Sequence, residues 1–189
     1  MARAAQLRST SRLRRNAGRG DGKGSLSHGH PIGNGSALDA LAFLNRDHRE
    51  LAELFDRYAL ARRTLAAPER RALALKICTA LTLHARLEDE LFYPTVRKNV
   101  SGVDELINDA SVEHATIKGL VMSIQDHESI DGLFDAKVKV LGDYVRHHIC
   151  DEQDKLFAKV RQADIDLREF GARLAERKSE LAGEAGPPN

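Results

Sequence analysis

The feature that most constrains the fold is a set of four histidines, each in the middle of a long segment with the apolar period of an amphipathic helix. They are His48, His84, His114 and His148. Apolar residues recur three and four positions away from each of them, which places every histidine on the buried face of its segment. Buried imidazoles are costly unless they have partners. The pattern therefore predicts helices that pack their histidine-bearing faces together.

Two of these histidines are followed four residues later by a glutamate, Glu88 after His84 and Glu152 after His148. Four residues are about one helical turn, so each pair shares a helix face. Both glutamates continue an apolar stripe, and the stripe of the second segment runs on to Leu91. A bound cation is the simplest common partner for buried imidazoles and carboxylates. These six residues are the predicted metal ligands.

The histidines also agree in their height along the helices. Turns are expected near residues 66, 99 and 130, and successive histidines lie 18 and 18, 15 and 15, and 16 and 18 residues from the turn between them. If the helices are antiparallel, a rise of about 1.5 Å per residue puts the four imidazoles within roughly 3 Å of one level. The sequence thus predicts an all-α, up-down-up-down four-helix bundle with a metal site in its core.

Local signals set the expected ends of the helices. The first should run from Ser36, as N-cap, to about Leu65. The second should carry Pro68 in its first turn and stop at Phe92, because Pro94 follows. The third should begin at Gly102 and Asp104, and the fourth should run from the cap Asp131 to about Val160. A shorter fifth helix should run from Asp164 to about Leu181 and pack across the bundle.

Charge and the expected helices together divide the chain into three parts. Residues 1–36 hold seven basic residues and one acidic residue, while residues 37–189 hold the other 22 basic and 27 acidic residues. The first part lacks a hydrophobic period and is expected to be a disordered, basic extension. Residues 37–160 should form the bundle, and residues 161–189 the extra helix and a tail. The extension has no interleaved aromatic residues, so a nucleic-acid partner is not expected.

Other composition signals concern the setting of the protein. No apolar run approaches the ~18 residues of a membrane span, so no such span is expected. The chain has two cysteines, Cys78 and Cys150, and no disulfide framework, which favours a reducing cytosol and a cytoplasmic protein. Each cysteine is either a small residue on a helix flank or a redox thiol near the metal.

Three further residues lie near the predicted site, and their roles stay open. Glu113 precedes His114, and is either solvated or close enough to reach the site. His147 points about 100° away from His148, so a surface or supporting role is expected. Lys118 stands one turn after His114, where a further nitrogen ligand could sit, but an ammonium cannot bind metal. The histidines not expected to be ligands are His28, His30, His127 and His147.

Taken together, these motifs resemble the hemerythrin family of cation-binding domains with His-His-Glu signatures. The resemblance covers residues 37–160. It is carried by Asp47-His48-Arg49-Glu50, by His84 to Glu88 with Leu91-Phe92-Tyr93-Pro94, by Glu113-His114, and by His147-His148 to Glu152 with Leu156-Phe157. The chain looks like the single-domain bacterial branch.

The resemblance implies a di-iron site. The four histidines would be terminal ligands, and Glu88 and Glu152 would bridge two iron ions together with an oxo or hydroxo group from solvent. Oxygen carriers of the family have a further histidine where this chain has Lys118. The departure implies one protein ligand fewer on one iron and argues against simple reversible oxygen carriage. Ala158 replaces a proline found in many relatives, so the fourth helix should run on.

Several functions fit this resemblance. The first is a non-haem di-iron protein that binds, senses or reacts with dioxygen, peroxide or nitric oxide, because mixed imidazole and carboxylate ligands suit iron. The alternative is an iron-handling protein that oxidises or buffers iron. An enzyme that consumes peroxide, a structural zinc bundle and a regulatory module acting through another chain are further hypotheses. The small ligand and any protein partner stay open.

Overall fold

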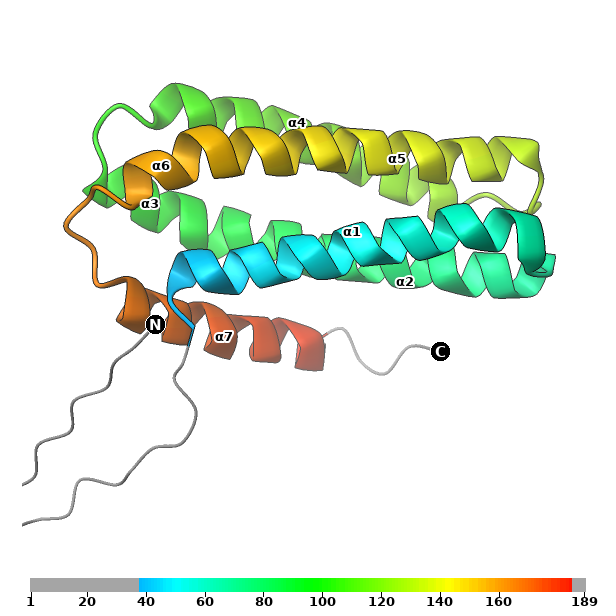
Figure 1. Ribbon diagram of the computed structural model, residues 1–189, viewed down its shortest axis with the longest axis horizontal. Helices are drawn as coiled ribbons and strands as arrows, with labels where there is room; N and C mark the ends of the chain where they lie inside the picture. Colours follow the sequence, from blue (N-terminus) through cyan, green and yellow to red (C-terminus); the bar gives the residue numbers. More distant parts are fainter. Residues whose placement is uncertain (1–37, 185–189) are drawn as a thin grey trace, which may run out of the picture. The chain divides into compact units, whose positions relative to one another are not determined.

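The four bundle helices are present, and two of them consist of three consecutive segments (Figure 1). The computed structural model describes residues 38–184, so the expected 1–36 extension and the tail after residue 184 lie outside the described residues. The segments are α1 (Ala40–Thr64), α2 (Ala67–Leu87) with η1 (Glu88–Phe92) and α3 (Tyr93–Asn99), α4 (Asp104–Gln125), α5 (Gly132–Asp151) with η2 (Glu152–Leu156) and α6 (Phe157–Val160), and α7 (Leu167–Glu184).

Consecutive bundle helices run antiparallel, and α7 lies along the bundle on its α1 and α2 side (Figure 1). Residues 38–184 contain helices and no strand, which confirms the predicted all-α bundle with an additional C-terminal helix. Among these residues, none of the helices is both long and apolar enough to cross a lipid bilayer.

Aspartates begin three of the helices. The prediction of Ser36 as the first N-cap was wrong, since α1 starts at Ala40 and the Asp39 carboxylate accepts the Ala42 backbone N–H at 2.8 Å. α7 also starts later than expected, because the carboxylate of Asp166, not that of Asp164, accepts the first free N–H groups. Asp131 caps α5 as predicted.

Pro94 does not end the second bundle helix, and the prediction that it would was wrong. The π-helical turn η1 precedes it, and the helix continues as α3 to Asn99. A proline ring clashes with the carbonyl four residues earlier in a regular α-helix. A π turn is wider than an α turn and lets the chain accept the ring without leaving the helix.

The polar residues of the predicted site form a layer between two apolar clusters. One cluster lies toward α3, α6 and α7 and includes Leu44, Phe92 and Phe157. The other fills the opposite half of the bundle and includes Leu51 and Phe134. The apolar core on both sides excludes water from the layer, so charges within it interact more strongly than they would in solvent.

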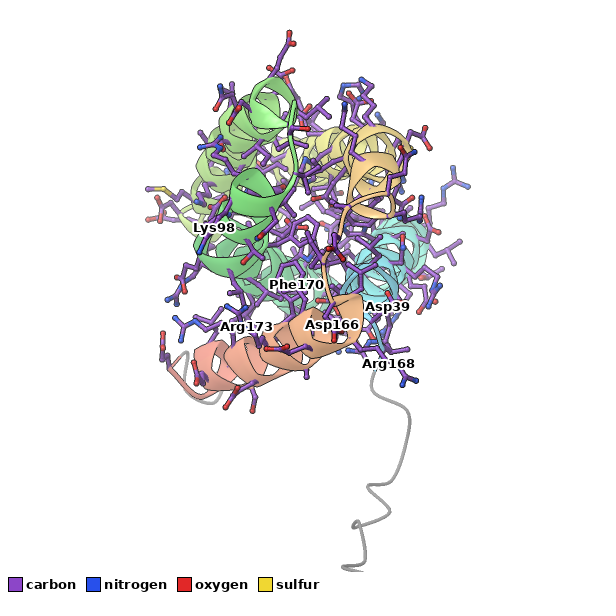
Figure 2. All side chains as sticks on the ribbon, turned by 90° about the vertical axis from the view of Figure 1, so that its left-hand side faces the viewer. Asp39, Lys98, Asp166, Arg168, Phe170 and Arg173 are labelled. Carbon is purple, nitrogen blue, oxygen red and sulfur yellow. The ribbon has the colours of Figure 1, made fainter. Side chains whose placement is uncertain are left out.

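α7 packs tightly on the start of α1. Phe170 points from α7 into the bundle (Figure 2) and is buried, as are Leu174 and Leu181. Gly171 faces the backbone of Leu38 and Ala40, and a Cβ at this position would lie 2.8 Å from the Ala40 nitrogen. The close approach of the two backbones therefore depends on the absence of a side chain at residue 171.

A buried ion pair holds the end of the bundle opposite α7. The Asp135 carboxylate accepts the Tyr58 hydroxyl at 2.7 Å and also pairs with the Arg70 guanidinium. Because loss of one member of a buried pair leaves the other uncompensated, we expect Asp135→Ala to lower the free energy of unfolding by about 3–5 kcal/mol. Tyr58→Phe removes one neutral donor and should cost about 1 kcal/mol. Urea unfolding measures both, and equal losses would contradict this account.

Candidate metal centre

The four predicted histidines meet in the centre of the bundle. His48 and His84 face each other with their Nε2 atoms 3.1 Å apart, and the Nε2 atoms of His114 and His148 are 3.2 Å apart. Each residue is at most 4% exposed. Nitrogen atoms about 2.1 Å from one ion, at roughly right angles, would be about 3 Å apart. The two histidine pairs thus have the spacing of two sets of metal ligands.

Glu88 lies between the two pairs and contacts both. Its Oε1 atom is 3.3 Å from Nε2 of His84 and 3.7 Å from that of His48, while its Oε2 atom is 3.3 Å from Nε2 of His114 and 4.0 Å from that of His148. The four histidine Nε2 atoms and the two Glu88 oxygens thus form two compact groups that share the Glu88 carboxylate. This is the arrangement that a bridging ligand requires.

Glu152 completes the layer from the fourth bundle helix. Its Oε2 atom lies 3.3 Å from Nε2 of His48, but Glu152 is outside the two compact groups that share Glu88. Among residues 38–184, none donates a hydrogen bond to either carboxylate, although both are buried. Four buried carboxylate oxygens without donors are costly. The residues therefore fit a cation, which would satisfy these oxygens and the Nε2 atoms together.

A π turn begins at each of the two glutamates and re-aims the residues that follow. Glu88 begins η1 and Glu152 begins η2, and in each case the N–H group five residues later bonds to the glutamate carbonyl. The extra residue shifts the buried stripe by one position. Leu91, predicted on the stripe, is only half-buried, whereas Phe92 is fully buried. π turns are frequent at functional sites because they re-aim side chains within a helix.

A ring of polar side chains surrounds the four histidines on the Nδ1 side. Asp89 and Glu113 accept the Nδ1 groups of His114 and His148, each at 2.8 Å. The remaining two contacts are those of the Gln153 amide with His48 Nδ1 at 3.2 Å and of Asp47 with His84 Nδ1 at 3.8 Å. A carboxylate that accepts the Nδ1–H group, as Asp89 and Glu113 do, orients a metal-binding imidazole and raises its basicity.

Sequence reasoning missed Asp47, Asp89 and Gln153, although a signal was present. Every member of the ring adjoins a predicted ligand in the sequence and contacts a ligand on the neighbouring helix. Adjacent residues point about 100° apart on a helix, so a residue next to an inward-facing ligand faces the next helix. The adjoining pairs are Asp47-His48, Glu88-Asp89, Glu113-His114 and Glu152-Gln153.

The pKa values of the two glutamates are shifted in opposite directions. Burial raises the pKa of Glu88, but the neighbouring histidines outweigh burial and hold that pKa well below its usual value. Burial and the negative charge of Glu88 together raise the pKa of Glu152 well above its usual value. Glu152 therefore holds a proton more strongly than Glu88 does. A cation would reverse the second effect, because it stabilises the carboxylate form.

The three residues of open role all lie outside the central layer. Glu113 is the Nδ1 partner of His148, and its carboxylate is a quarter exposed. Lys118 donates to Asp89 at 2.8 Å, so its ammonium lies on the Nδ1 side of His114 and away from the Nε2 atoms. The His147 side chain is 67% exposed and 3.9 Å from Glu113.

The cysteines lie apart from the polar layer. Cys78 is buried within the apolar cluster of α1, α2, α4 and α5, and burial raises the pKa of its thiol to about 11. A thiol with such a pKa stays protonated and unreactive at neutral pH. The interpretation as a small core residue is therefore favoured for Cys78. Cys150 is exposed on α5.

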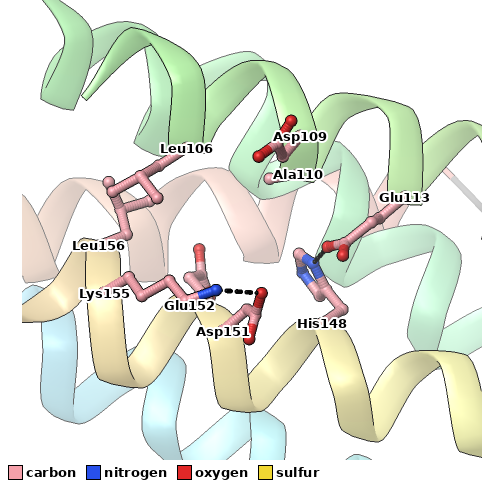
Figure 3. A pocket seen from close by; sticks show the side chains of 9 residues that line it. All are labelled: Leu106, Asp109, Ala110, Glu113, His148, Asp151, Glu152, Lys155 and Leu156. Carbon is pink, nitrogen blue, oxygen red and sulfur yellow. Dashed lines mark hydrogen bonds and ion pairs between the residues drawn. The ribbon is translucent and has the colours of Figure 1, made fainter. Parts of the chain in front are cut away.

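A small polar pocket connects the layer with the surface between α4 and α5 (Figure 3). Its volume is about 30 Å³, enough for one or two water-sized molecules. His148 and Glu152 form the buried side, while Asp109, Asp151 and Lys155 stand nearer the solvent. The pocket gives a small molecule a route to two of the six predicted ligands.

A helical bundle with two histidine groups around a shared buried carboxylate defines a metal-binding bundle protein. The profile of the hemerythrin HHE cation binding domain matches residues 39–160, from the start of α1 to the end of α6. The chain belongs to this family, as its sequence motifs predicted.

A solved structure shares the fold. It is the crystal structure of a hemerythrin HHE cation binding domain-containing protein from Mycobacterium kansasii, with a TM-score of 0.67 and 22% sequence identity. The alignment covers 78% of this chain and 90% of that protein. A comparison with curated protein sequences found no significant match.

Proposed function

We propose that this chain is a non-haem di-iron protein that binds, senses or reacts with a small oxidant, namely dioxygen, peroxide or nitric oxide. The observation that carries the proposal is the position of Glu88, whose two oxygens face two different histidine pairs. A site for a single ion would need only one of these histidine pairs beside the carboxylate. Iron is the proposed metal because imidazole and carboxylate ligands together suit it.

In this proposal His48 and His84 would hold one ion and His114 and His148 would hold the other, with Glu88 as a ligand shared by both groups. Glu152 contributes a second carboxylate from the opposite side of the layer. Bound iron would supply redox chemistry and a position for a small ligand. The chain itself fixes the ligand atoms, keeps bulk water out through the two apolar clusters, and orients each imidazole through its Nδ1 partner.

The pocket of Figure 3 sets the size of the proposed ligand. About 30 Å³ admits a diatomic molecule or peroxide but excludes an ordinary organic substrate. The ligand would arrive beside Glu152 and His148. Lys118 is bound to Asp89 and is not among the residues that line this pocket.

Metal content and ligand binding test the proposal together. We expect protein produced in iron-replete medium and purified without oxygen to contain two irons per chain. Nitric oxide or peroxide should change its visible absorption, because each would bind at the iron. Elemental analysis showing one zinc and no iron would overturn the di-iron assignment. Two irons with a spectrum that neither ligand changes would leave the metal site standing and overturn the proposed ligand class.

Iron handling is the second candidate, and the charge of the pocket favours it. Asp109, Glu113 and Asp151 line the route to Glu152, with Lys155 as the one cationic side chain of the lining. A polar passage with excess negative charge attracts metal cations. A protein that oxidises or buffers iron should take up ferrous iron in air beyond two ions per chain, whereas a ligand-binding protein should stop at two. Gas evolution from peroxide would reveal a peroxide-consuming enzyme.

The proposed setting is the cytoplasm. It is supported by the two cysteines, both of which are free thiols.

A further inference from the structure

One of the four histidines depends on a residue outside the bundle. The partners of His48, His114 and His148 are Gln153, Asp89 and Glu113, all on the four bundle helices. The partner of His84 is Asp47, and the Asp47 carboxylate accepts the Lys178 ammonium at 2.6 Å. Lys178 belongs to α7, which lies beyond the family match of residues 39–160.

We propose that α7 is a positioning element of the metal site, which acts through Lys178 and Asp47 on His84. The inference rests on the proposed metal-binding function. It assigns to α7 a role in metal retention and makes Lys178 a positioning residue, since its ammonium touches neither a predicted ligand atom nor the pocket of Figure 3.

The burial of Asp47 explains why the lysine matters. The Asp47 side chain is 2% exposed, and its Oδ1 atom has no hydrogen-bond partner among residues 38–184. A buried carboxylate holds one orientation only while a donor or counter-charge is bound to it. Lys178 donates the one hydrogen bond that the carboxylate receives in this part of the chain. The Arg46 guanidinium also approaches Oδ1, but only to 4.0 Å. Without Lys178, the carboxylate would lose its one hydrogen-bond donor and the contact that holds its position beside His84.

A similar chain in the other half of the site provides an internal comparison. Lys118 donates to Asp89, which accepts Nδ1 of His114, so lysine, aspartate and histidine follow in the same order. The Asp89 side chain is 30% exposed, against 2% for Asp47. Water can donate hydrogen bonds to Asp89 when its lysine is removed, but it cannot reach Asp47 in the same way. Loss of Lys178 should therefore affect the site more than loss of Lys118.

The docking of α7 fixes the position of Lys178. Gly171 lets the α7 backbone meet that of α1. Arg177, next to Lys178, donates to Glu90 in η1 of the second bundle helix. His84, Asp47 and Lys178 border one pocket of about 200 Å³ between α1, α2 and α7. If α7 left this surface, water would reach Asp47 and weaken its interaction with His84.

Iron release from the full-length chain tests the inference. Wild-type protein and the variants are loaded with ferrous iron without oxygen, and transfer of each iron to an excess of chelator is followed by absorbance. Because loss of such a supporting partner costs 10–100-fold in metal affinity, we expect Lys178→Met to release one of the two irons about tenfold faster. Lys178→Arg keeps the charge and should restore most of the retention. Lys76→Met removes an exposed lysine that borders the same pocket and should behave as wild type.

A second measurement uses the wild type alone. Coupling between two sites is reciprocal, so iron loading should slow hydrogen exchange of the α7 amides if α7 docking favours metal binding. Unchanged α7 exchange on loading, or release from Lys178→Met that is no faster than wild type, would overturn the inference and leave the proposed function intact. Wild-type protein that binds no iron would overturn the proposed function and the inference with it.

Discussion

Glu88→Gln is expected to remove both metal ions from the protein while leaving the bundle folded. The substitution keeps the size of the side chain and removes the charge that each histidine pair faces, at 3.3 Å from His84 and from His114. Loss of one shared ligand weakens the binding of both ions at once. We therefore expect metal affinity to fall by roughly 100-fold or more, beyond the usual effect of a supporting residue. Elemental analysis after purification gives the metal content, and circular dichroism gives the helicity.

Two further variants provide a comparison for the metal content of Glu88→Gln. Glu152→Gln should lower metal content less than Glu88→Gln, because Glu152 lies near one histidine of the layer and outside both compact groups. His147→Ala should leave metal content unchanged, since its imidazole is 67% exposed. If His147→Ala lost the metal while Glu88→Gln kept it, the assignment of the ligands would be wrong.

Gly171→Ala should lower the stability of the protein by an unusually large amount for the addition of one methyl group. The new Cβ would lie 2.8 Å from the Ala40 nitrogen and closer still to the Leu38 carbonyl oxygen. Backbone atoms cannot rotate away as a side chain can, so α7 must shift from α1. We expect the free energy of unfolding to fall by at least about 3 kcal/mol, the upper range for overpacking. Urea unfolding measures it.

Gly119→Ala is the matched control, because Gly119 lies within α4 and a Cβ there would meet nothing within 4 Å. Alanine favours helix over glycine, so this variant should gain about 0.5–1 kcal/mol. Opposite signs for the same substitution in two helices would show that contact with α1, and not helix propensity, decides the effect at residue 171. A Gly171→Ala protein as stable as wild type would contradict the described packing.

Much of the fold could be predicted because it follows from a regular period. The inward stripes of α1, α4 and α5 were read correctly, since apolar residues at helical spacing have one way to be buried together. The prediction failed where the period changes. A π turn adds one residue to a turn, and the motif around Pro94 is compatible with either a helix end or a bulge. That choice depends on whether Leu91 or Phe92 is buried against the rest of the bundle, which is a tertiary requirement.

The candidate site shows the same division between local and tertiary information. The six central residues were predicted as metal ligands from their spacing, and the structure brings their side chains into one buried layer. The ring around them was missed because its members look like ordinary polar neighbours of the histidines. Lys178 could not have been found at all, since it meets Asp47 across 131 residues of sequence and no local spacing encodes that contact.

The central claim is that Glu88 lies between two iron ions. Anomalous X-ray diffraction from crystals of the iron-loaded protein, collected on both sides of the iron absorption edge, tests it most directly. The account predicts two iron peaks, one beside His48 and His84 and the other beside His114 and His148, with the Glu88 carboxylate between them. A single peak, or two peaks that Glu88 does not join, would contradict it.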